Sequence, residues 1–128
     1  MKIRIQTKTY RILFVIWTAI MFTMTSIPEL NTAPDRLLNI DKLYHIILYF
    51  VFTVLYIRMN KDKQGRGTLR VLIILLLILP FLDELHQIPI PGRSFSLLDV
   101  IADVIGFFAA IILFRKELLQ KQHLPREG

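Results

Sequence analysis

Four apolar stretches alternate with short polar stretches along the chain. They cover about residues 12–27, 43–57, 69–82 and 95–114. A helix needs about 20 residues to cross a hydrocarbon core of about 30 Å. When each stretch is extended into its polar flanks, the pattern predicts transmembrane helices over about residues 10–27, 40–57, 69–87 and 96–114. We therefore expect an all-α membrane bundle of four helices, formed by a single domain over residues 1–128.

The basic residues are distributed very unequally among the polar stretches. Of the 16 Lys and Arg residues, only Arg36, Lys42 and Arg93 fall in the first and third connections. Loops rich in Lys and Arg remain in the cytoplasm. This asymmetry predicts a multi-pass protein with a cytoplasmic N-terminus, a cytoplasmic C-terminus, and first and third connections that face outward.

Composition narrows the possible partners. A hydrophobic content of 54%, gathered in four separate apolar stretches, leaves too little polar surface for a small water-soluble domain. The net charge of +6 could suit nucleic acid, but the basic residues flank the apolar stretches, so lipid head groups explain them better. We expect membrane lipids as partners and no nucleic acid. The chain has no cysteine and hence no disulfide framework, and its first apolar stretch is expected to be an uncleaved helix because no convincing cleavage site follows it.

Ionisable residues lie near the outer end of three predicted spans. Each such residue costs on the order of 2.5–3.5 kcal/mol on insertion, which marks it as a candidate functional group. In the second span, Asp41, His45 and Tyr49 follow one another at intervals of four and therefore share one face. In the fourth, Asp99 and Asp103 do the same. With Asp83, Glu84, His86 and Gln87 of the third span, these residues predict a shared outward pocket.

The third connection adds a cation to this pocket. Pro89, Pro91 and Gly92 predict a stiff turn that holds Arg93 over the carboxylates. Arg93 could pair with Asp99 or Glu84, or present its guanidinium to a phosphate or carboxylate ligand. Further along, Gly106 with Ala109 and Ala110 forms a small face that allows another helix to approach closely.

The order of these motifs resembles the VanZ-like family of small bacterial membrane proteins. The resemblance extends from Ser26 to about Ala110, and two features depart from it: Asp103 stands where the family more often has Asn, and Ala110 where it more often has Gly. The motifs that carry it are Ser26-Ile27-Pro28, Asp41-Lys42-Leu43-Tyr44-His45, Asp83-Glu84-Leu85-His86-Gln87, Pro91-Gly92-Arg93-Ser94 through Asp99, and Asp103-Val104-Ile105-Gly106.

The resemblance implies a protein of the bacterial cell membrane. The best-known relative gives low-level resistance to teicoplanin, a lipid-bearing glycopeptide antibiotic, and the resemblance supplies no settled biochemical activity. We therefore expect a function in lipoglycopeptide tolerance or in a lipid process of the cell envelope, with a lipid-like or lipoglycopeptide ligand.

Three roles for the polar residues remain open. The pocket could be an enzyme site acting on an envelope lipid or lipid-linked glycan, a binding site for an amphiphile, or a structural network that holds the helices together. Ser96 to Asp99 also has the form of a helix capping box, and Lys42 could extend to lipid head groups. No metal-ligand spacing such as HExxH is present, so no metal and no cofactor are expected. The candidates are His45, Glu84 and Asp99 for catalysis, Asp41, Lys42, Tyr49, Gln87, Arg93, Ser94 and Asp103 for binding, and Gly106 for packing.

Overall fold

A computed structural model describes residues 6–28, 35–63 and 65–119, and the side chains of residues 35–39 are not described. The elements are α1 (Thr7–Thr25), α2 (Asp35–Met59), a short 3₁₀ turn η1 (Lys61–Lys63), α3 (Arg66–Gln87) and α4 (Leu97–Leu119). Within these ranges there is no strand, so the all-α prediction is confirmed. The Arg36 side chain, the first five residues and the basic tail beyond residue 119 lie outside the described part.

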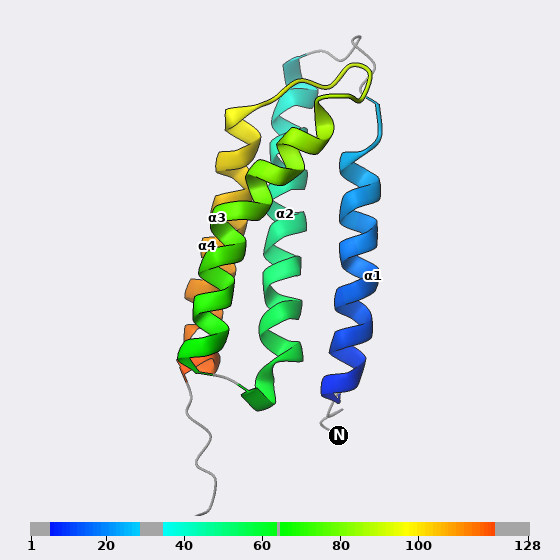
Figure 1. Ribbon diagram of the computed structural model, residues 1–128. Coiled ribbons are helices and arrows are strands. Elements are labelled where there is room, and N and C mark those ends of the chain that lie inside the picture. Colours follow the sequence, from blue (N-terminus) through cyan, green and yellow to red (C-terminus); the bar gives the residue numbers. More distant parts are fainter. Residues whose placement is uncertain (1–5, 29–34, 64, 120–128) are drawn as a thin grey trace, which may run out of the picture.

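The four helices form an up-and-down bundle (Figure 1). The chain reverses direction at each connection, so the ends of α1 and α3 meet the beginnings of α2 and α4. The most extensive interface joins α2 to α4, followed by α1 with α2 and α3 with α4, whereas α1 and α3 touch little. The connection from α3 to α4 passes over the end of the bundle where α1 and α3 end, and it extends towards α1 (Figure 1).

The α2–α4 interface is close because α4 carries a glycine there. A Cβ atom built on Gly106 would collide with the backbone carbonyl oxygen of Ile46 and lie 3.0 Å from the backbone nitrogen of Phe50. Backbones can approach this closely only where one helix has no side chain. Gly106 therefore brings the polar residues of α2 and α4 within reach of each other.

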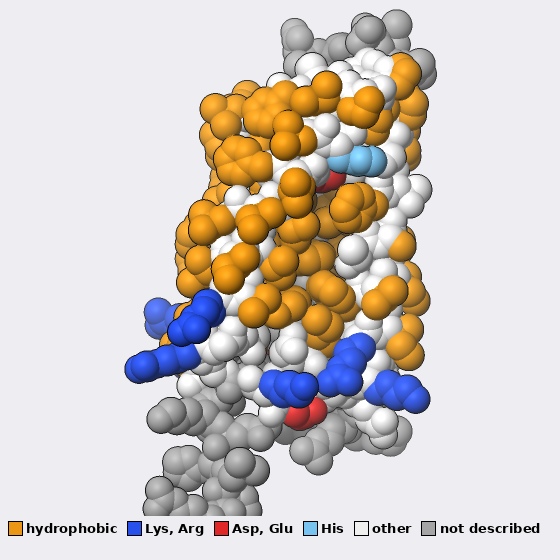
Figure 2. Space-filling model, viewed as in Figure 1, with side chains coloured by type: hydrophobic (Ala, Val, Ile, Leu, Met, Phe, Trp, Pro, Cys, Tyr) orange, Lys and Arg blue, Asp and Glu red, His pale blue; other side chains and the backbone are white. Residues whose placement is uncertain are grey.

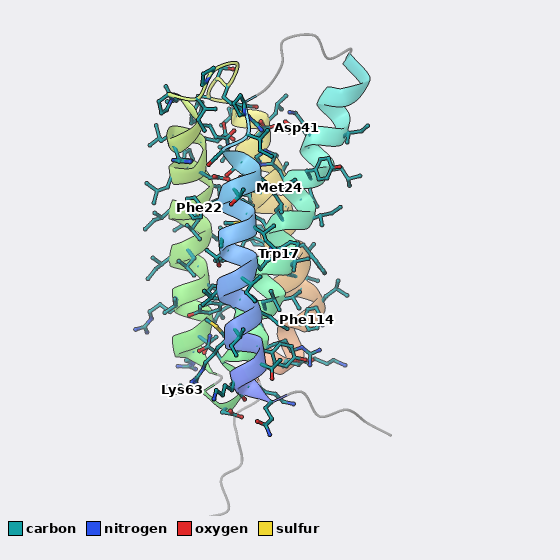
Figure 3. The ribbon with its side chains drawn as sticks, turned by 90° about the vertical axis from the view of Figure 1, so that its right-hand side faces the viewer. Trp17, Phe22, Met24, Asp41, Lys63 and Phe114 are labelled. Carbon is teal, nitrogen blue, oxygen red and sulfur yellow. The ribbon has the colours of Figure 1, made fainter. Side chains whose placement is uncertain are left out.

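Aromatic side chains fill the middle of the bundle. The ring centroids of Tyr49 and Phe107 lie 5.5 Å apart, and those of Phe14 and Phe52 lie 4.8 Å apart. The indole Nε1 of Trp17 in α1 donates a hydrogen bond of 3.0 Å to the backbone carbonyl oxygen of Leu48 in α2 (Figure 3). The contacts of Phe14 and Trp17 hold α1 against α2, and that of Tyr49 with Phe107 joins α2 to α4.

Helix α3 contains a buried proline in its second half. Pro80 has no N–H to donate to the carbonyl four residues earlier, and such a proline kinks a helix. The ribbon of α3 leans towards α1 in its last turns (Figure 1). Asp83, Glu84 and Gln87 lie in these turns and are buried, so the bend directs the polar part of α3 into the bundle.

The two ends of the bundle differ in charge. Lys and Arg side chains gather at the end that contains η1, below a body covered by hydrophobic side chains (Figure 2). We name this the basic end; Arg58 and Glu117 form an ion pair of 3.1 Å there, and Thr7 donates to Asp62 at 2.6 Å. Asp41 lies at the opposite end, far from Lys63 (Figure 3).

Two helices in the described part are long and apolar enough to cross a membrane. These segments are Ile40–Met59 and Leu97–Leu119. Helix α1 begins with a polar segment that includes Lys8 and Arg11, and α3 carries charged residues near both ends, so neither has the same apolar length. The helix bounds lie near the predicted spans.

Candidate functional site

A cluster of buried polar side chains lies at the end opposite the basic end. Helix α2 contributes one of its members, α3 three and α4 two, and all are at most 5% exposed. Burial of charged groups is costly unless they are paired, so their contacts define what the cluster can do. We name this group the polar cluster, and its members are His45, Asp83, Glu84, Gln87, Asp99 and Asp103.

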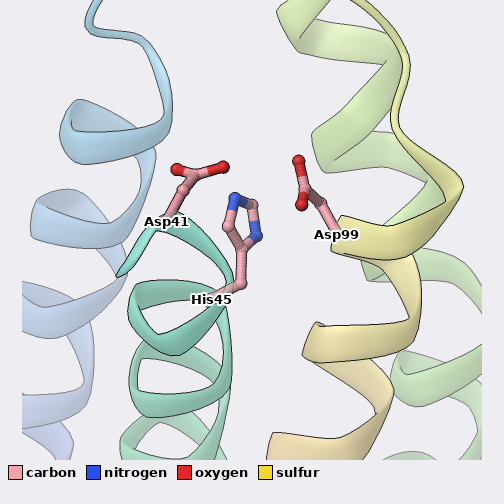
Figure 4. A group of neighbouring side chains, drawn as sticks. All are labelled: Asp41, His45 and Asp99. Carbon is pink, nitrogen blue, oxygen red and sulfur yellow. The ribbon is translucent and has the colours of Figure 1, made fainter. Parts of the chain in front are cut away.

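Two ionisable pairs join α2 to α4. Lys42 Nζ lies 2.5 Å from Asp99 Oδ1, and His45 Nδ1 and Asp103 Oδ1 share a hydrogen bond of 2.8 Å. Lys42 and His45 are three residues apart in α2, and Asp99 and Asp103 are four residues apart in α4, so the two residues that each helix contributes lie on one face of it. His45 lies between Asp41 and Asp99 (Figure 4). The predicted stripes on these two helices thus face one another.

Asp103 orients the imidazole of His45. A carboxylate on Nδ1 fixes the ring and leaves Nε2 available as an acceptor or a metal ligand. The second carboxylate oxygen, Asp103 Oδ2, is buried and has no hydrogen-bond partner among the described residues. This oxygen is therefore an open acceptor in the middle of the cluster.

Helix α3 joins the cluster through Asp83 and Glu84. The Tyr49 hydroxyl of α2 donates to Asp83 Oδ2 at 3.3 Å. Glu84 accepts at Oε2 from the backbone N–H of Ser96, at 2.7 Å, and at Oε1 from the Gln87 side-chain amide, at 3.3 Å. Glu84 therefore links the start of α4 to α3, and it also contacts Gln87 one turn further along α3.

The predicted capping box at the start of α4 is formed with a different partner. Ser96 Oγ accepts from the Asp99 backbone N–H at 3.3 Å, as a capping serine does. In a capping box the Ser96 N–H would donate to the Asp99 side chain, but here it donates to Glu84 Oε2 of α3. The Asp99 carboxylate is thereby left to pair with Lys42.

Arg93 lies at the edge of the cluster. Gly92 has a φ of 80°, which suits glycine, so the turn before Arg93 depends on that residue. Arg93 donates from Nη1 to Gln87 Oε1 at 3.2 Å and from Nε to the Ile27 carbonyl oxygen at 3.1 Å. No ion pair of Arg93 with Asp99 or Glu84 forms among the described residues, because Lys42 and the start of α4 already occupy these carboxylates. Ser94 is exposed.

A cavity of about 170 Å³ opens beside the cluster, between the end of α1 and the start of α2. Asp41, His45 and Arg93 give it charged groups of both signs. The rest of its wall is mainly apolar, with Met24, Thr25, Ile27, Tyr44 and Leu48.

Two sets of side chains could hold a metal ion. In each, the possible ligand atoms lie within 4.8 Å of one another. One set is Asp41, His45 and Asp99 (Figure 4); the other is His45, Asp83 and Asp103.

Several contacts of the site were not anticipated from the sequence. The sequence predicts Asp83 in the third span but not among the candidate catalytic or binding residues, although its spacing of four from Gln87 places both on one face. Ser26 Oγ and His86 Nε2 share a hydrogen bond of 2.9 Å that joins α1 to α3. No local pattern could have paired these two residues, because 60 positions separate them.

The fold and the site define a class: an all-helical bundle whose buried ionisable groups gather at one end. The profile of the VanZ/LLP1 family matches residues 3–120, and the chain belongs to this family. Comparison with curated proteins finds no match. Comparison with solved structures finds none either.

Proposed function

We propose that this protein is a four-span protein of the bacterial cell membrane, with both termini in the cytoplasm. The outer faces of all four helices support this proposal, because they carry aliphatic side chains where a water-soluble bundle would carry charges. Examples are Val15 in α1, Leu77 in α3 and Leu113 in α4, which are 66%, 62% and 70% exposed. The basic end then faces the cytoplasm and the polar cluster faces outward.

Cysteine labelling tests this topology directly, because the natural chain has no cysteine. We expect Ser94→Cys to react with a membrane-impermeant maleimide on intact cells. Lys61→Cys, in the exposed turn η1, is expected to react only after the cells are permeabilised. The reverse pattern would overturn the proposed orientation. Labelling of both positions on intact cells would place them on the same side and would contradict a single membrane crossing by α3 between them.

We propose further that the cavity binds the head group of an amphiphilic envelope molecule. The observation that carries this is the composition of the cavity wall, in which Arg93, Asp41 and His45 lie beside apolar side chains. Such a wall suits a ligand that has a charged or polar head and an apolar tail. Arg93 suits a phosphate or carboxylate, and the ligand class includes lipids and lipoglycopeptides such as teicoplanin.

Susceptibility of a host strain tests the proposed link to lipoglycopeptides. We expect expression of the natural chain to raise tolerance of teicoplanin more than tolerance of vancomycin, which lacks the lipid tail. Arg93→Ala and Asp41→Asn are expected to lower tolerance to that of the empty vector while membrane abundance is unchanged. Asp62→Asn, which removes a carboxylate at the basic end, serves as the matched control and should retain tolerance. Equal tolerance for the cavity variants and the natural chain would remove the cavity from this function.

A second candidate function is acid/base catalysis on the bound head group. The observation that favours it is the His45–Asp103 pair, because a carboxylate on Nδ1 prepares a histidine to accept a proton at Nε2. His45→Gln keeps a polar side chain in the cluster but cannot transfer protons. If this variant accumulates normally and retains full tolerance, the site acts by binding alone.

A further inference from the structure

Three ligands of mixed type converge inside the polar cluster. His45 from α2, Asp83 from α3 and Asp103 from α4 are all buried, and their possible ligand atoms lie within 4.8 Å of one another. Bonds from a metal to imidazole nitrogen or carboxylate oxygen are about 2.0–2.2 Å long. Small side-chain movements would therefore close the three groups on one ion.

One ligand atom of this set is open. Asp103 Oδ2 is buried and has no hydrogen-bond partner among the described residues, and a buried carboxylate oxygen without a partner is costly. In the other set, Asp99 is already paired with Lys42 at 2.5 Å. The open acceptor therefore favours the set that contains Asp103.

The balance of charges at the end that holds the polar cluster also favours binding of a cation. The described carboxyl groups outnumber the side chains of fixed positive charge, and burial makes such an excess unfavourable unless protons or a cation neutralise it. The carboxyl groups are those of Asp41, Asp83, Glu84, Asp99 and Asp103, and the fixed charges are those of Lys42 and Arg93.

We propose that His45, Asp83 and Asp103 bind one divalent transition-metal ion, of the class of Zn²⁺ or Mn²⁺. One imidazole and two carboxylates suit these ions better than Mg²⁺ or Ca²⁺, which prefer oxygen ligands alone. The cavity reaches His45 and carries Asp41 in its wall, which gives a cation a route of access. The ion would connect α2, α3 and α4, and its remaining coordination positions would take water or an oxygen atom of a bound molecule.

The sequence contains no local metal motif because each ligand comes from a different helix. Known short motifs place two ligands on one helix or loop. Here 38 positions separate His45 from Asp83, and another 20 separate Asp83 from Asp103. The proposal depends on this convergence and is independent of which amphiphile the cavity binds.

Metal titration of the full chain tests the proposal. The protein is purified in detergent without a polyhistidine tag, treated with EDTA and passed into metal-free buffer. We expect it to bind one equivalent of Mn²⁺, measured as loss of the free Mn²⁺ signal in electron paramagnetic resonance, and to bind Zn²⁺ in competition. Loss of a residue that only hydrogen-bonds a metal ligand weakens metal binding roughly 10- to 100-fold. Asp83→Asn and Asp103→Asn each remove a ligand itself, so we expect each to weaken binding by at least this factor.

Glu117→Gln is the matched control. Its carboxylate is also paired and has a buried oxygen, but it lies at the basic end, so its removal should leave metal affinity unchanged. Failure of the natural chain to bind, or equal binding by the natural chain and the two cluster variants, would overturn the proposal. A second readout needs no variant: Zn²⁺ should raise the Tm of the natural chain and EDTA should reverse the rise, whereas an unchanged Tm would also overturn it.

Discussion

Replacement of Gly106 by alanine is expected to destabilise the bundle severely. The new Cβ would collide with the Ile46 backbone carbonyl, and backbone cannot rotate away as the end of a side chain can. Overpacking costs about 1–3 kcal/mol where side chains can adjust, and we expect the upper end of this range or more at Gly106. The measurement is helix content against denaturant in detergent, together with membrane abundance.

Gly67→Ala is the control for this change. Gly67 is also helical, but a Cβ atom there meets nothing within 4 Å. Because alanine favours the helix over glycine by about 1 kcal/mol, this variant should be neutral or more stable. If Gly106→Ala is as stable as Gly67→Ala, the close approach of α2 and α4 at this position is wrong.

Lys42→Met is expected to have the second large effect. The change leaves the Asp99 carboxylate, whose side chain is 8% exposed, without its cation. Removing one partner of a buried pair costs about 3–5 kcal/mol, and we expect a value near the lower limit because the Lys42 side chain is 28% exposed. The free energy of unfolding in detergent measures the loss.

A second substitution isolates the cause. Asp99→Asn removes the stranded charge, so the double variant Lys42→Met with Asp99→Asn should recover most of the lost stability. Lys61→Met, in the exposed turn η1, should change little. Additive losses in the double variant would show that the two side chains act independently.

The helices could be predicted from the sequence because the apolar pattern alone marks them. The predicted spans were about 18 to 19 residues long, close to the length that a bilayer requires, whereas the helices extend further at several ends, as for α2, which reaches from Asp35 to Met59. Hydrogen bonding continues a helix past its apolar part wherever the next residues tolerate helical geometry, and hydropathy does not record this.

The helix faces could also be predicted, but the partners could not. Spacing of four placed Asp41 with His45, and Asp99 with Asp103, on common faces. Which residue of one helix meets which residue of another depends on how far each helix is shifted along its axis and how it is rotated about that axis. Gly106, which lets α4 approach α2, and Pro80, which bends α3, both affect this arrangement. Lys42 therefore reached Asp99 in place of Arg93, and Glu84 reached the Ser96 N–H.

Trp17 is the single tryptophan of the chain, and it lies where two helices meet. Its indole donates to the carbonyl of Leu48, and Leu48 is also part of the cavity wall. Tryptophan fluorescence of the natural protein therefore comes from one position at the junction of α1 and α2. Separation of α1, or occupation of the cavity beside Leu48, would change the emission of this built-in fluorophore without any label being attached.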